Sequence, residues 1–484
     1  LINQELPKVV KLFDQGNILQ VFKITKELYK LNPNNELIKN YYDKSRKYAK
    51  LKLNKEGPEV LIKFRGDSIF QTLGYYPIDS FSVPRVSNSY QLKIIDNDKT
   101  YLFENVFNSV TVDNHSYDLP EDNSEILENH VVMPGRSIRN FRVYGRNTGV
   151  TYIPTFSISK NEVSNSEFQE FINDGGYQNP TFWDFPIKIG DKLYEFRNTV
   201  SNFNGKFGKN GPASWSYGKF PNGLDNHPVS GISWFEARAY ANYRKQELPN
   251  IHQWIYASKT YANILDSEVM KNGNFNSDFT KPVLDDSGSL DGINNIGGNV
   301  KEWTINKSGN NKDKFTAAGG SYLEPAYQFV GQNFQNPSDR LAGNGIRLVK
   351  NLSKDGDYSL DDYAISQRIF RNIDNEPKIS DEMFNYYKSQ FNYSAKNLNV
   401  ETEFIKSTNN NYSVESFSMD PAYVSQEKLS GYIIYSNKTT KKYNPVIIFP
   451  HGGSLRSTNL DIIPARLIRT FSYLLDEGYA IIYP

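Results

Sequence analysis

The spacing of hydrophobic residues changes along the chain, and the first change lies near residue 56. In residues 1–55 hydrophobic side chains recur every three or four positions, which predicts amphipathic helices. In residues 57–128 they alternate with polar ones, which predicts strands with one buried face. Typical members are Val9, Leu12 and Phe13 for the helices and Val60, Ile62 and Phe64 for the strands. We therefore expect a helical linker followed by a small β-sandwich.

Residues 130–350 combine short helical patterns with unusually long loops. Three helix starts carry a hydrogen-bonding residue followed three positions later by Glu or Gln, the sequence of a capping box. The pairs are Ser164 and Glu167, Ser233 and Glu236, and Asn250 and Gln253. Between the helices lie Gly-, Asn- and Pro-rich stretches such as 173–226 and 265–298. Loops of this length in a compact domain are usually functional, or are held in place by ions.

The last part, 351–484, begins with polar helical patterns and ends with a strand, a helix and a second strand. Residues 445–449 are a short apolar run typical of a buried strand, and the helical pattern that follows ends at Gly478. Residues 479–483 are a second apolar run. A strand, a helix and a strand in this order predict a βαβ unit.

Composition and charge exclude several classes of function. The net charge is +1 and the lysines are spread out beside acids, so a nucleic-acid surface is not expected. No apolar run approaches the roughly 18 residues of a membrane span, so we expect no membrane contact. The absence of cysteine excludes disulfides, thiolate metal sites and cysteine nucleophiles. The chain starts without Met and reads as a fragment open at both ends, and the cytoplasm is favoured over export.

Six ordered motifs resemble those of the formylglycine-generating enzyme, or sulfatase-modifying factor, family. They lie at residues 156–171, 227–234, 248–257, 292–303, 319–322 and 345–348. The fourth reads GINNIGGNVKEW where the family has GLYDMxGNVWEW. The resemblance implies a compact, loop-rich relative of the C-type lectin fold. We thus expect an α+β protein of several domains, with the boundaries 1–55, 57–128, 130–350 and 351–484.

The same resemblance implies that the family's oxygen-dependent chemistry is lost. The family binds copper with two cysteines shortly after its GGS motif, and soft thiolates suit Cu(I). Counting along from Gly319, the matching positions are Glu324 and Phe329. We therefore expect no copper, no formylglycine formation and no catalytic residue in this domain. The related iron enzymes use a histidine cluster, which His227 and His252 alone do not supply.

A calcium site is implied by the family's GNVWEW loop. Its ligands combine side-chain and backbone oxygens, a mixture that suits a hard cation. The matching positions are the side chains of Asn295 and Glu302 and the carbonyls of Gly298 and Val300. A second family site starts at the position of Asn274. The alternative is that these polar groups only satisfy the backbone of a tight loop.

Other residues of the motifs are expected to be structural. Arg347 should anchor a buried carboxylate or carbonyls, and His227 should form a hydrogen bond rather than bind a metal. The tryptophans of the motifs should belong to the core. They are Trp234, Trp254 and Trp303.

The predicted βαβ unit resembles the start of an α/β-hydrolase. His451, Gly452 and Gly453 follow its first strand, as in the oxyanion loop of esterases and oligopeptidases. No G-x-S-x-G elbow follows before Pro484, and Ser454 within the loop is a poor nucleophile. The hydrolase domain is therefore truncated here. The alternative is a Gly-rich turn in an unrelated βαβ fold.

The order of the parts resembles that of large bacterial proteins in which a Ser/Thr protein kinase precedes such modules. The first segment resembles a tetratricopeptide hairpin, and 57–128 resembles PEGA-type β modules. The first hypothesis is therefore a non-oxidising binding or scaffold domain fused to a hydrolase. Its partner is an unknown protein or small molecule, and the chain by itself should be catalytically inert.

Two alternative functions of the central domain stay open. One is a cysteine-independent, metal-dependent oxidase, which needs a ligand cluster that five scattered histidines do not form. The other is a lectin-like ligand-recognition module with an aromatic cleft. The cleft would be lined by Trp183, Tyr322, Tyr327 and Phe329.

Overall fold

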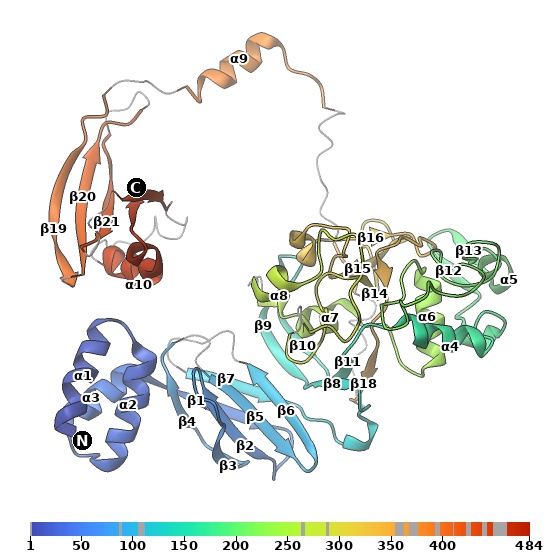
Figure 1. The fold of residues 1–484 in the computed structure, drawn as a ribbon, viewed down its shortest axis with the longest axis horizontal. Coiled ribbons are helices and arrows are strands. Elements are labelled where there is room, and N and C mark those ends of the chain that lie inside the picture. The colour runs from blue at the N-terminus through green and yellow to red at the C-terminus, as the bar shows by residue number, and fades with distance from the viewer. Residues whose placement is uncertain are drawn as a thin grey trace. The chain divides into compact units, whose positions relative to one another are not determined.

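The computed structural model describes most of the 484 residues and separates them into two compact units. One unit comprises Leu1–Tyr41 together with Arg371–Pro484, and the other comprises Tyr42–Phe370. Figure 1 shows the elements of both units. The described residues are 2–86, 90–104, 112–262, 267–286, 290–353, 363–366, 376–392, 397–409, 411–422, 427–437, 443–448 and 462–484. No helix among them is long and apolar enough to cross a bilayer.

Three helices open the chain: α1 (Ile2–Asp14), α2 (Ile18–Leu31) and α3 (Glu36–Ser45). Asn17 begins α2, because its side chain accepts a hydrogen bond from the backbone N–H of Gln20 at 3.4 Å. The helices bury one apolar face each in a shared cluster. Its buried members are Val9, Val21, Leu28 and Ile38.

The helical segment is shorter than predicted, because residues 46–53 are a strand. β1 (Arg46–Leu53) pairs with β4 (Phe81–Pro84) and with β7 (Val112–Tyr117). Buried and exposed residues alternate along it, which is the period of a strand. The prediction of a helical linker to residue 55 is therefore wrong from residue 46 onward. The alternating buried positions are Ala49, Leu51 and Leu53.

The β domain consists of two sheets with the strand orders β4-β1-β7 and β3-β2-β5-β6. The further strands are β2 (Glu59–Phe64), β3 (Gln71–Tyr75), β5 (Tyr90–Asp96) and β6 (Lys99–Glu104). The ring of Phe103 on β6 stacks on Tyr117 of β7 at 4.1 Å. The hydroxyl of Tyr90 on β5 lies 2.8 Å from Nε2 of His115 on β7. Side chains of the two sheets thus meet face to face, and each sheet buries one face.

The central domain combines short helices, small sheets and long loops (Figure 1). Its sheets have the orders β18-β11-β8, β16-β15-β14-β17, β10-β9 and β12-β13. The strands are β8 (His130–Met133), β9 (Arg136–Val143), β10 (Arg146–Ile153), β11 (Phe156–Ser159), β12 (Ile187–Ile189), β13 (Lys192–Tyr194), β14 (Lys301–Lys307), β15 (Phe315–Ala318), β16 (Phe334–Gln335), β17 (Asn344–Gly345) and β18 (Val349–Asn351). The helices are η1 (Asn123–Glu125), α4 (Asn165–Asn173), η2 (Pro180–Phe182), α5 (Phe196–Val200), α6 (Trp234–Tyr243), α7 (Ile251–Ala257), η3 (Thr260–Ala262), α8 (Ser267–Asn272) and η4 (Ala326–Val330).

The three predicted capping boxes are all present. At the start of α4, Ser164 Oγ accepts from the N–H of Glu167 at 3.3 Å, and Glu167 Oε2 accepts from the N–H of Ser164 at 2.8 Å. The same reciprocal pairs begin α6 and α7. Each box satisfies backbone donors that a helix start leaves without a partner. These boxes therefore fix where the three helices begin.

Aromatic side chains fill two hydrophobic clusters of the central domain. In the first cluster the rings of Trp234 and Phe315 stack at 4.1 Å, and Trp303 is fully buried. In the second cluster Trp254 meets the edge of Phe329. The predicted core positions of the three motif tryptophans are thus confirmed.

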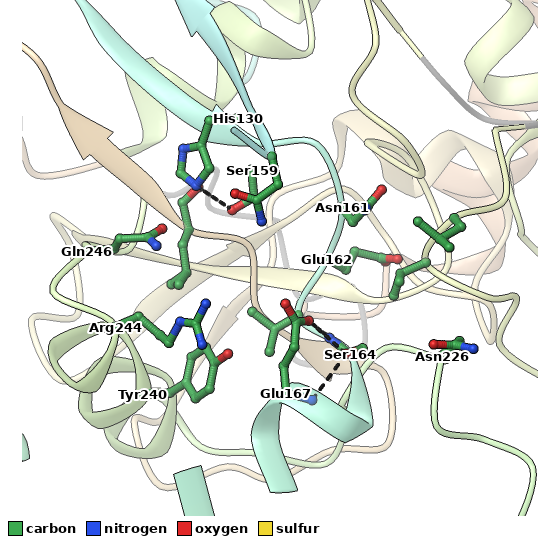
Figure 2. Close-up of a pocket in the computed structure, with 15 residues that line it drawn as sticks. His130, Ser159, Asn161, Glu162, Ser164, Glu167, Asn226, Tyr240, Arg244 and Gln246 are labelled. Atoms are coloured by element: carbon green, nitrogen blue, oxygen red, sulfur yellow. Dashed lines mark hydrogen bonds between the residues drawn. The ribbon is translucent and has the colours of Figure 1, made fainter. Parts of the chain in front are cut away.

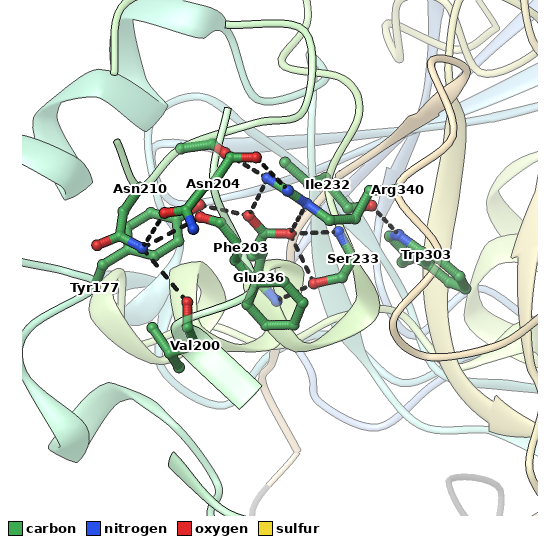
Figure 3. Close-up of polar contacts among 11 residues, drawn as sticks. Tyr177, Val200, Phe203, Asn204, Asn210, Ile232, Ser233, Glu236, Trp303 and Arg340 are labelled. Atoms are coloured by element: carbon green, nitrogen blue, oxygen red, sulfur yellow. Dashed lines mark hydrogen bonds and ion pairs between the residues drawn. The ribbon is translucent and has the colours of Figure 1, made fainter. Parts of the chain in front are cut away.

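A buried ion pair ties the long loop before α6 to that helix (Figure 3). Glu236 accepts hydrogen bonds from Arg340, from Nε at 2.9 Å and from Nη2 at 3.0 Å. The hydroxyl of Tyr177 donates to the same carboxylate at 2.6 Å. Arg340 also donates to the carbonyls of Asn204 and Gly211 in the loop. Charge-assisted hydrogen bonds thus fix a loop that has little regular structure of its own.

The C-terminal part holds α9 (Asp381–Ser389) and a five-stranded sheet of order β19-β20-β21-β23-β22. The strands are β19 (Glu401–Asn409), β20 (Tyr412–Met419), β21 (Leu429–Ser436), β22 (Asn444–Ile447) and β23 (Tyr479–Tyr483). Helix α10 (Ile462–Asp476) lies between β22 and β23 in the sequence, and these two strands pair in parallel. The predicted βαβ unit is therefore confirmed.

The first strand of this unit is less buried than its apolar run predicts. β22 lies at the edge of the sheet, and Ile447 is 56% exposed. The sheet is buried where α10 covers it, in a cluster that includes Leu475 and Ile481. The predicted oxyanion loop lies outside the described residues. It comprises His451, Gly452 and Gly453.

Candidate functional site

The two positions that were expected to match the family's cysteines carry an ion-paired carboxylate and a buried ring. Glu324 Oε1 lies 3.0 Å from Lys301 Nζ, and Glu324 Oε2 accepts a hydrogen bond from Ser321 Oγ at 3.1 Å. Phe329 is 1% exposed and packs against Trp254. Both places are occupied by groups that contact the fold, and neither offers the sulfur ligand that Cu(I) prefers.

Lys301 belongs to this site and was missed by sequence reasoning. It is the first residue of β14, and its side chain is 7% exposed. It stands where the family's GNVWEW motif has its first Trp, and this departure was the available signal. A buried ammonium beside Glu324 balances the carboxylate and repels a metal cation at the same place. One of the two expected cysteine positions, Glu324, is thus held in an ion pair.

Residues 295–302 form the tight loop to which calcium was assigned by resemblance. The backbone φ is positive at Asn295 (50°), Gly298 (81°) and Asn299 (55°), so the chain turns sharply here. A Cβ at Gly298 would lie 2.6 Å from the carbonyl oxygen of Asn274. Only glycine therefore fits at Gly298, and the structure brings Asn274 and Gly298 into contact.

The polar groups of this loop fit a cation at Asn295 better than at Glu302. Asn295 Nδ2 donates to the carbonyl of Pro282 at 3.3 Å, but the buried Oδ1 has no partner among the described residues. Such an acceptor costs about 1–3 kcal/mol, and a hard cation would satisfy it. Glu302 already accepts from Arg347 Nε and from Trp254 Nε1, both at 2.8 Å. Arg347 thus balances the charge of Glu302.

Asn274 braces the loop through its amide group. Its Nδ2 donates to the carbonyl of Phe279 at 2.9 Å and to Oδ1 of Asn299 at 3.1 Å. Oδ1 of Asn299 accepts a second hydrogen bond from the N–H of Lys281 at 2.8 Å. Both donor hydrogens of Asn274 are therefore used within the loop, which favours the structural alternative for this residue.

Glu162 is a second residue that sequence reasoning missed. Its carboxyl group is 1% exposed and accepts from Asn299 Nδ2 at 2.8 Å and from the N–H of Val300 at 3.3 Å. Burial raises the pKa of Glu162 to about 8, and Arg347 opposes this rise only in part. The group is therefore mostly protonated at neutral pH. Its signal in the sequence was the EVSN segment, which matches the family's EVTN.

Glu162 lines a polar cavity of about 190 Å³ (Figure 2). On its wall, His130 Nδ1 lies 3.0 Å from Ser157 Oγ, and His130 Nε2 lies 3.4 Å from Ser159 Oγ. Burial lowers the pKa of His130 to about 4, so this ring is neutral at pH 7. Figure 2 also shows Arg244 beside the cavity. The cavity can therefore hold a few waters or a small polar group.

Two predicted structural roles are confirmed. His227 forms a hydrogen bond through Nδ1 to Thr280 Oγ1 at 2.8 Å. Arg347 is fully buried and anchors the carboxylate of Glu302 together with three backbone carbonyls. The carbonyls are those of Ser159, Lys160 and Asn294.

The predicted aromatic cleft does not form. Trp183 and Phe329 are buried in different hydrophobic clusters, whereas Tyr327 is 65% exposed. Two of the four rings are core residues, so they cannot line one surface together with Tyr322. In the part of the chain that the structure describes, no group of three or more His, Cys, Asp or Glu residues could hold a metal ion. A ligand cluster for a metal-dependent oxidase is therefore missing from that part.

Known proteins resemble the central part of the chain. The formylglycine-generating enzyme of Bos taurus is 27% identical over 247 residues, which cover 41% of this chain and 66% of that enzyme. The hercynine oxygenase of Mycolicibacterium smegmatis is 30% identical over 105 residues, which cover 22% of this chain and 23% of that protein. The chain thus spans less than a quarter of the length of this oxygenase.

Two further similarities and a family match complete the comparison. The serine/threonine-protein kinase pkn1 of Chlamydia caviae is 25% identical over 157 residues, which cover 31% of this chain and 23% of the kinase. Among solved structures, CarF has a TM-score of 0.31 at 17% identity, covering 46% of this chain and 97% of CarF. Residues 118–352 match the sulfatase-modifying factor enzyme 1-like domain family. The residues that carry this match contain no cysteine.

Proposed function

We propose that the sulfatase-modifying factor-like domain is a non-oxidising binding or scaffold module of a multidomain bacterial protein. The observation that supports the proposal is what occupies the two positions where the family's cysteines are expected. Glu324 is held by Lys301 and Ser321, and Phe329 is packed in the core. The contacts of both residues stabilise the fold, so the partner is a protein or small molecule rather than an oxidation substrate.

The proposal follows from the donor atoms that copper needs. Cu(I) prefers two soft sulfur ligands at close range. Glu324 offers hard oxygens that are already paired with an ammonium, and Phe329 offers no donor atom. Lys301 adds a positive charge that a copper ion would meet at short distance. The domain thus keeps its frame but lacks the donors for the family's reaction.

The chain, incubated with copper and oxygen, is expected to leave a sulfatase-derived cysteine peptide unchanged. Mass spectrometry of the peptide detects the aldehyde, because its formation lowers the peptide mass. A formylglycine-generating enzyme run in parallel is the positive control. Aldehyde formed by the chain above a protein-free blank would overturn the proposal.

We also propose a calcium ion beside Asn295, held by its Oδ1 and by the carbonyls of Gly298 and Val300. Calcium at about 100 times its Kd should raise the unfolding temperature of the EDTA-treated chain by about 5 °C, because it binds the folded state. Asn295→Gly should abolish this rise, since glycine keeps the positive φ but removes Oδ1.

Asn140→Gly is the matched control for the calcium experiment, because Asn140 also has a positive φ (56°) but is exposed. This variant should keep the full rise in unfolding temperature. An equal rise in the Asn295→Gly variant would place the ion elsewhere and contradict the assignment.

A second function is favoured by the C-terminal βαβ unit. The parallel strands β22 and β23, joined through α10, form the kind of frame on which α/β-hydrolases are built. In this proposal residues 451–453 supply the oxyanion loop of an esterase or peptidase. The similarity to the kinase pkn1 supports the further proposal that the chain belongs to a protein with a Ser/Thr kinase domain.

A further inference from the structure

A larger cavity lies between the β domain and the central domain, both of which belong to the unit Tyr42–Phe370. Its volume is about 490 Å³, within the range of roughly 300–1,000 Å³ that is typical of small-molecule sites. Strand β6 of the β domain and strands β8 and β9 of the central domain line it. Neither Glu324 nor Asn295 is among its lining residues, so it is separate from those two positions, although it shares His130 with the polar cavity beside Glu162.

The cavity contains a cation without a counter-charge. Arg136, the first residue of β9, lines it, and its Nε is shielded from solvent and has no hydrogen-bond acceptor among the described residues. No carboxylate of the described residues forms an ion pair with Arg136. Its guanidinium lies instead over the ring of Tyr117, 5.1 Å from the centroid. A guanidinium is always charged, and a sequestered charge without a partner is costly. An anion from outside would remove that cost.

A hydroxyl donor without a partner lies beside this cation. Tyr117 is 1% exposed, and its hydroxyl has no hydrogen-bond partner of good geometry within the described part of the chain, although Arg136 lies close enough to interact with it. The hydroxyl of Tyr256, by contrast, donates to the carbonyl of Pro134 at 3.1 Å. Tyr117 therefore retains a donor that an anion bound to Arg136 could accept. Two unsatisfied donors, one of them charged, thus belong to the same cavity.

The remaining surroundings of the cavity combine aromatic rings with charges of both signs. The rings of Phe103, Tyr256 and Tyr261 line it. The charges of Lys259 and Asp291 balance each other in an ion pair. Lys99, Glu128 and Lys160 also line the cavity, but Arg136 is the lining cation that has a buried nitrogen without an acceptor among the described residues. The aromatic walls around it suit a flat, apolar body.

We propose that this cavity binds a small molecule that carries a carboxylate or phosphate on an aromatic body. The anion accepts hydrogen bonds from the Nε–H of Arg136 and from the hydroxyl of Tyr117. The aromatic ring of the ligand lies among Phe103, Tyr256 and Tyr261. The proposal does not depend on calcium or on the loss of oxidation, because neither Asn295 nor Glu324 lines this cavity.

Calorimetric titration of the full chain with phenyl phosphate and with phenylacetate tests the site. At least one of these two compounds should bind. Inorganic phosphate, which has the anion without the ring, and benzyl alcohol, which has the ring without the anion, should each bind at least tenfold more weakly. Arg136→Gln should weaken the binding at least tenfold. Arg139→Gln is the matched control, because Arg139 is exposed on the same strand, and it should leave the affinity unchanged.

Tyr117→Phe provides a second and milder test, because it removes only the hydroxyl and keeps the buried ring. It should weaken the binding about threefold or more, even if Arg136→Gln fails to fold. Three outcomes would each overturn the proposal: no binding of either aromatic anion, equal losses in the Arg136 and Arg139 variants, or unchanged affinity in the Tyr117→Phe variant. None of these outcomes would bear on the proposal that the domain does not oxidise cysteine peptides.

Discussion

Arg347→Met is expected to lower the free energy of unfolding of the central domain by about 3–5 kcal/mol, the range for removing one partner of a buried ion pair. Arg347 and Glu302 are 0% and 1% exposed in their side chains, and their Nε–Oε1 distance is 2.8 Å. Methionine fills similar space but donates nothing. The Glu302 carboxylate would then be buried with only the indole N–H of Trp254 as a donor.

The loss has a second source in the backbone. The two Nη atoms of Arg347 donate to three carbonyls, which belong to the segments 159–160 and 294. The same side chain therefore joins the end of β11 to the start of the tight loop. Without it, three carbonyl acceptors, of which that of Ser159 is buried, lose a charged donor, and each such loss adds to the cost.

Urea unfolding followed by tryptophan fluorescence measures this effect, because all five tryptophans lie between residues 183 and 303. The signal thus reports on the central domain alone. Arg197→Met, at an exposed arginine, is the control and should change stability by less than about 0.5 kcal/mol. Adding Glu302→Gln to Arg347→Met should restore part of the loss, since it removes the uncompensated charge. A loss below about 1 kcal/mol in the single variant would contradict the role of this pair.

Local chemistry in the sequence predicted the frame of the domain well. A capping box requires two side chains three positions apart, so Ser164 and Glu167 could be recognised without knowledge of the fold. Arg347 could be predicted as an anchor from its motif, because a single buried arginine needs partners wherever they come from. The βαβ unit followed from the order of apolar runs and a terminating glycine. The capping boxes depend on residues that are close in sequence, whereas the role of Arg347 was predicted from the family motif because its partners lie 45 or more positions away.

Features that depend on distant partners were not predicted. Lys301 and Glu324 are 23 positions apart, and the departure of Lys301 from the family motif does not by itself indicate which residue it pairs with. Glu162 meets Asn299 across 137 positions, so its burial could not be predicted from its neighbours. The aromatic cleft was wrong for the same reason, because Trp183 and Phe329 were grouped by type although the fold buries them in separate clusters.

The prediction of a helix from residue 46 to residue 55 was wrong for a different reason. Short stretches with a period of two can also be read as one face of a helix. In addition, no Gly or Pro lies at Ser45 or Arg46 to mark the boundary between α3 and β1. What decides the conformation is pairing with β4 and β7, which begin more than 30 positions later. Tertiary contacts thus override a weak local preference, as strand propensity generally allows.

Glu162→Gln is expected to make the central domain less sensitive to pH. Burial raises the pKa of Glu162 from 4.5 to about 8, so the folded state holds a proton that the unfolded state has released. The stability from this group is therefore fully present below about pH 4.5 and is lost as the pH rises to about 8. The slope is about 1.4 kcal/mol per pH unit, or about 2–3 kcal/mol between pH 6 and pH 8.

Glutamine resembles the protonated acid but cannot ionise. The free energy of unfolding of the variant, relative to that of the wild type, should therefore rise by about 2–3 kcal/mol between pH 6 and pH 8. The measurement is urea unfolding by tryptophan fluorescence at several pH values, in EDTA because a bound calcium ion would favour the charged carboxylate. Glu170→Gln, at an exposed carboxylate, should give a curve parallel to that of the wild type. If the Glu162→Gln curve were also parallel, Glu162 would be ionised in the folded state, and Arg347 rather than burial would govern its charge.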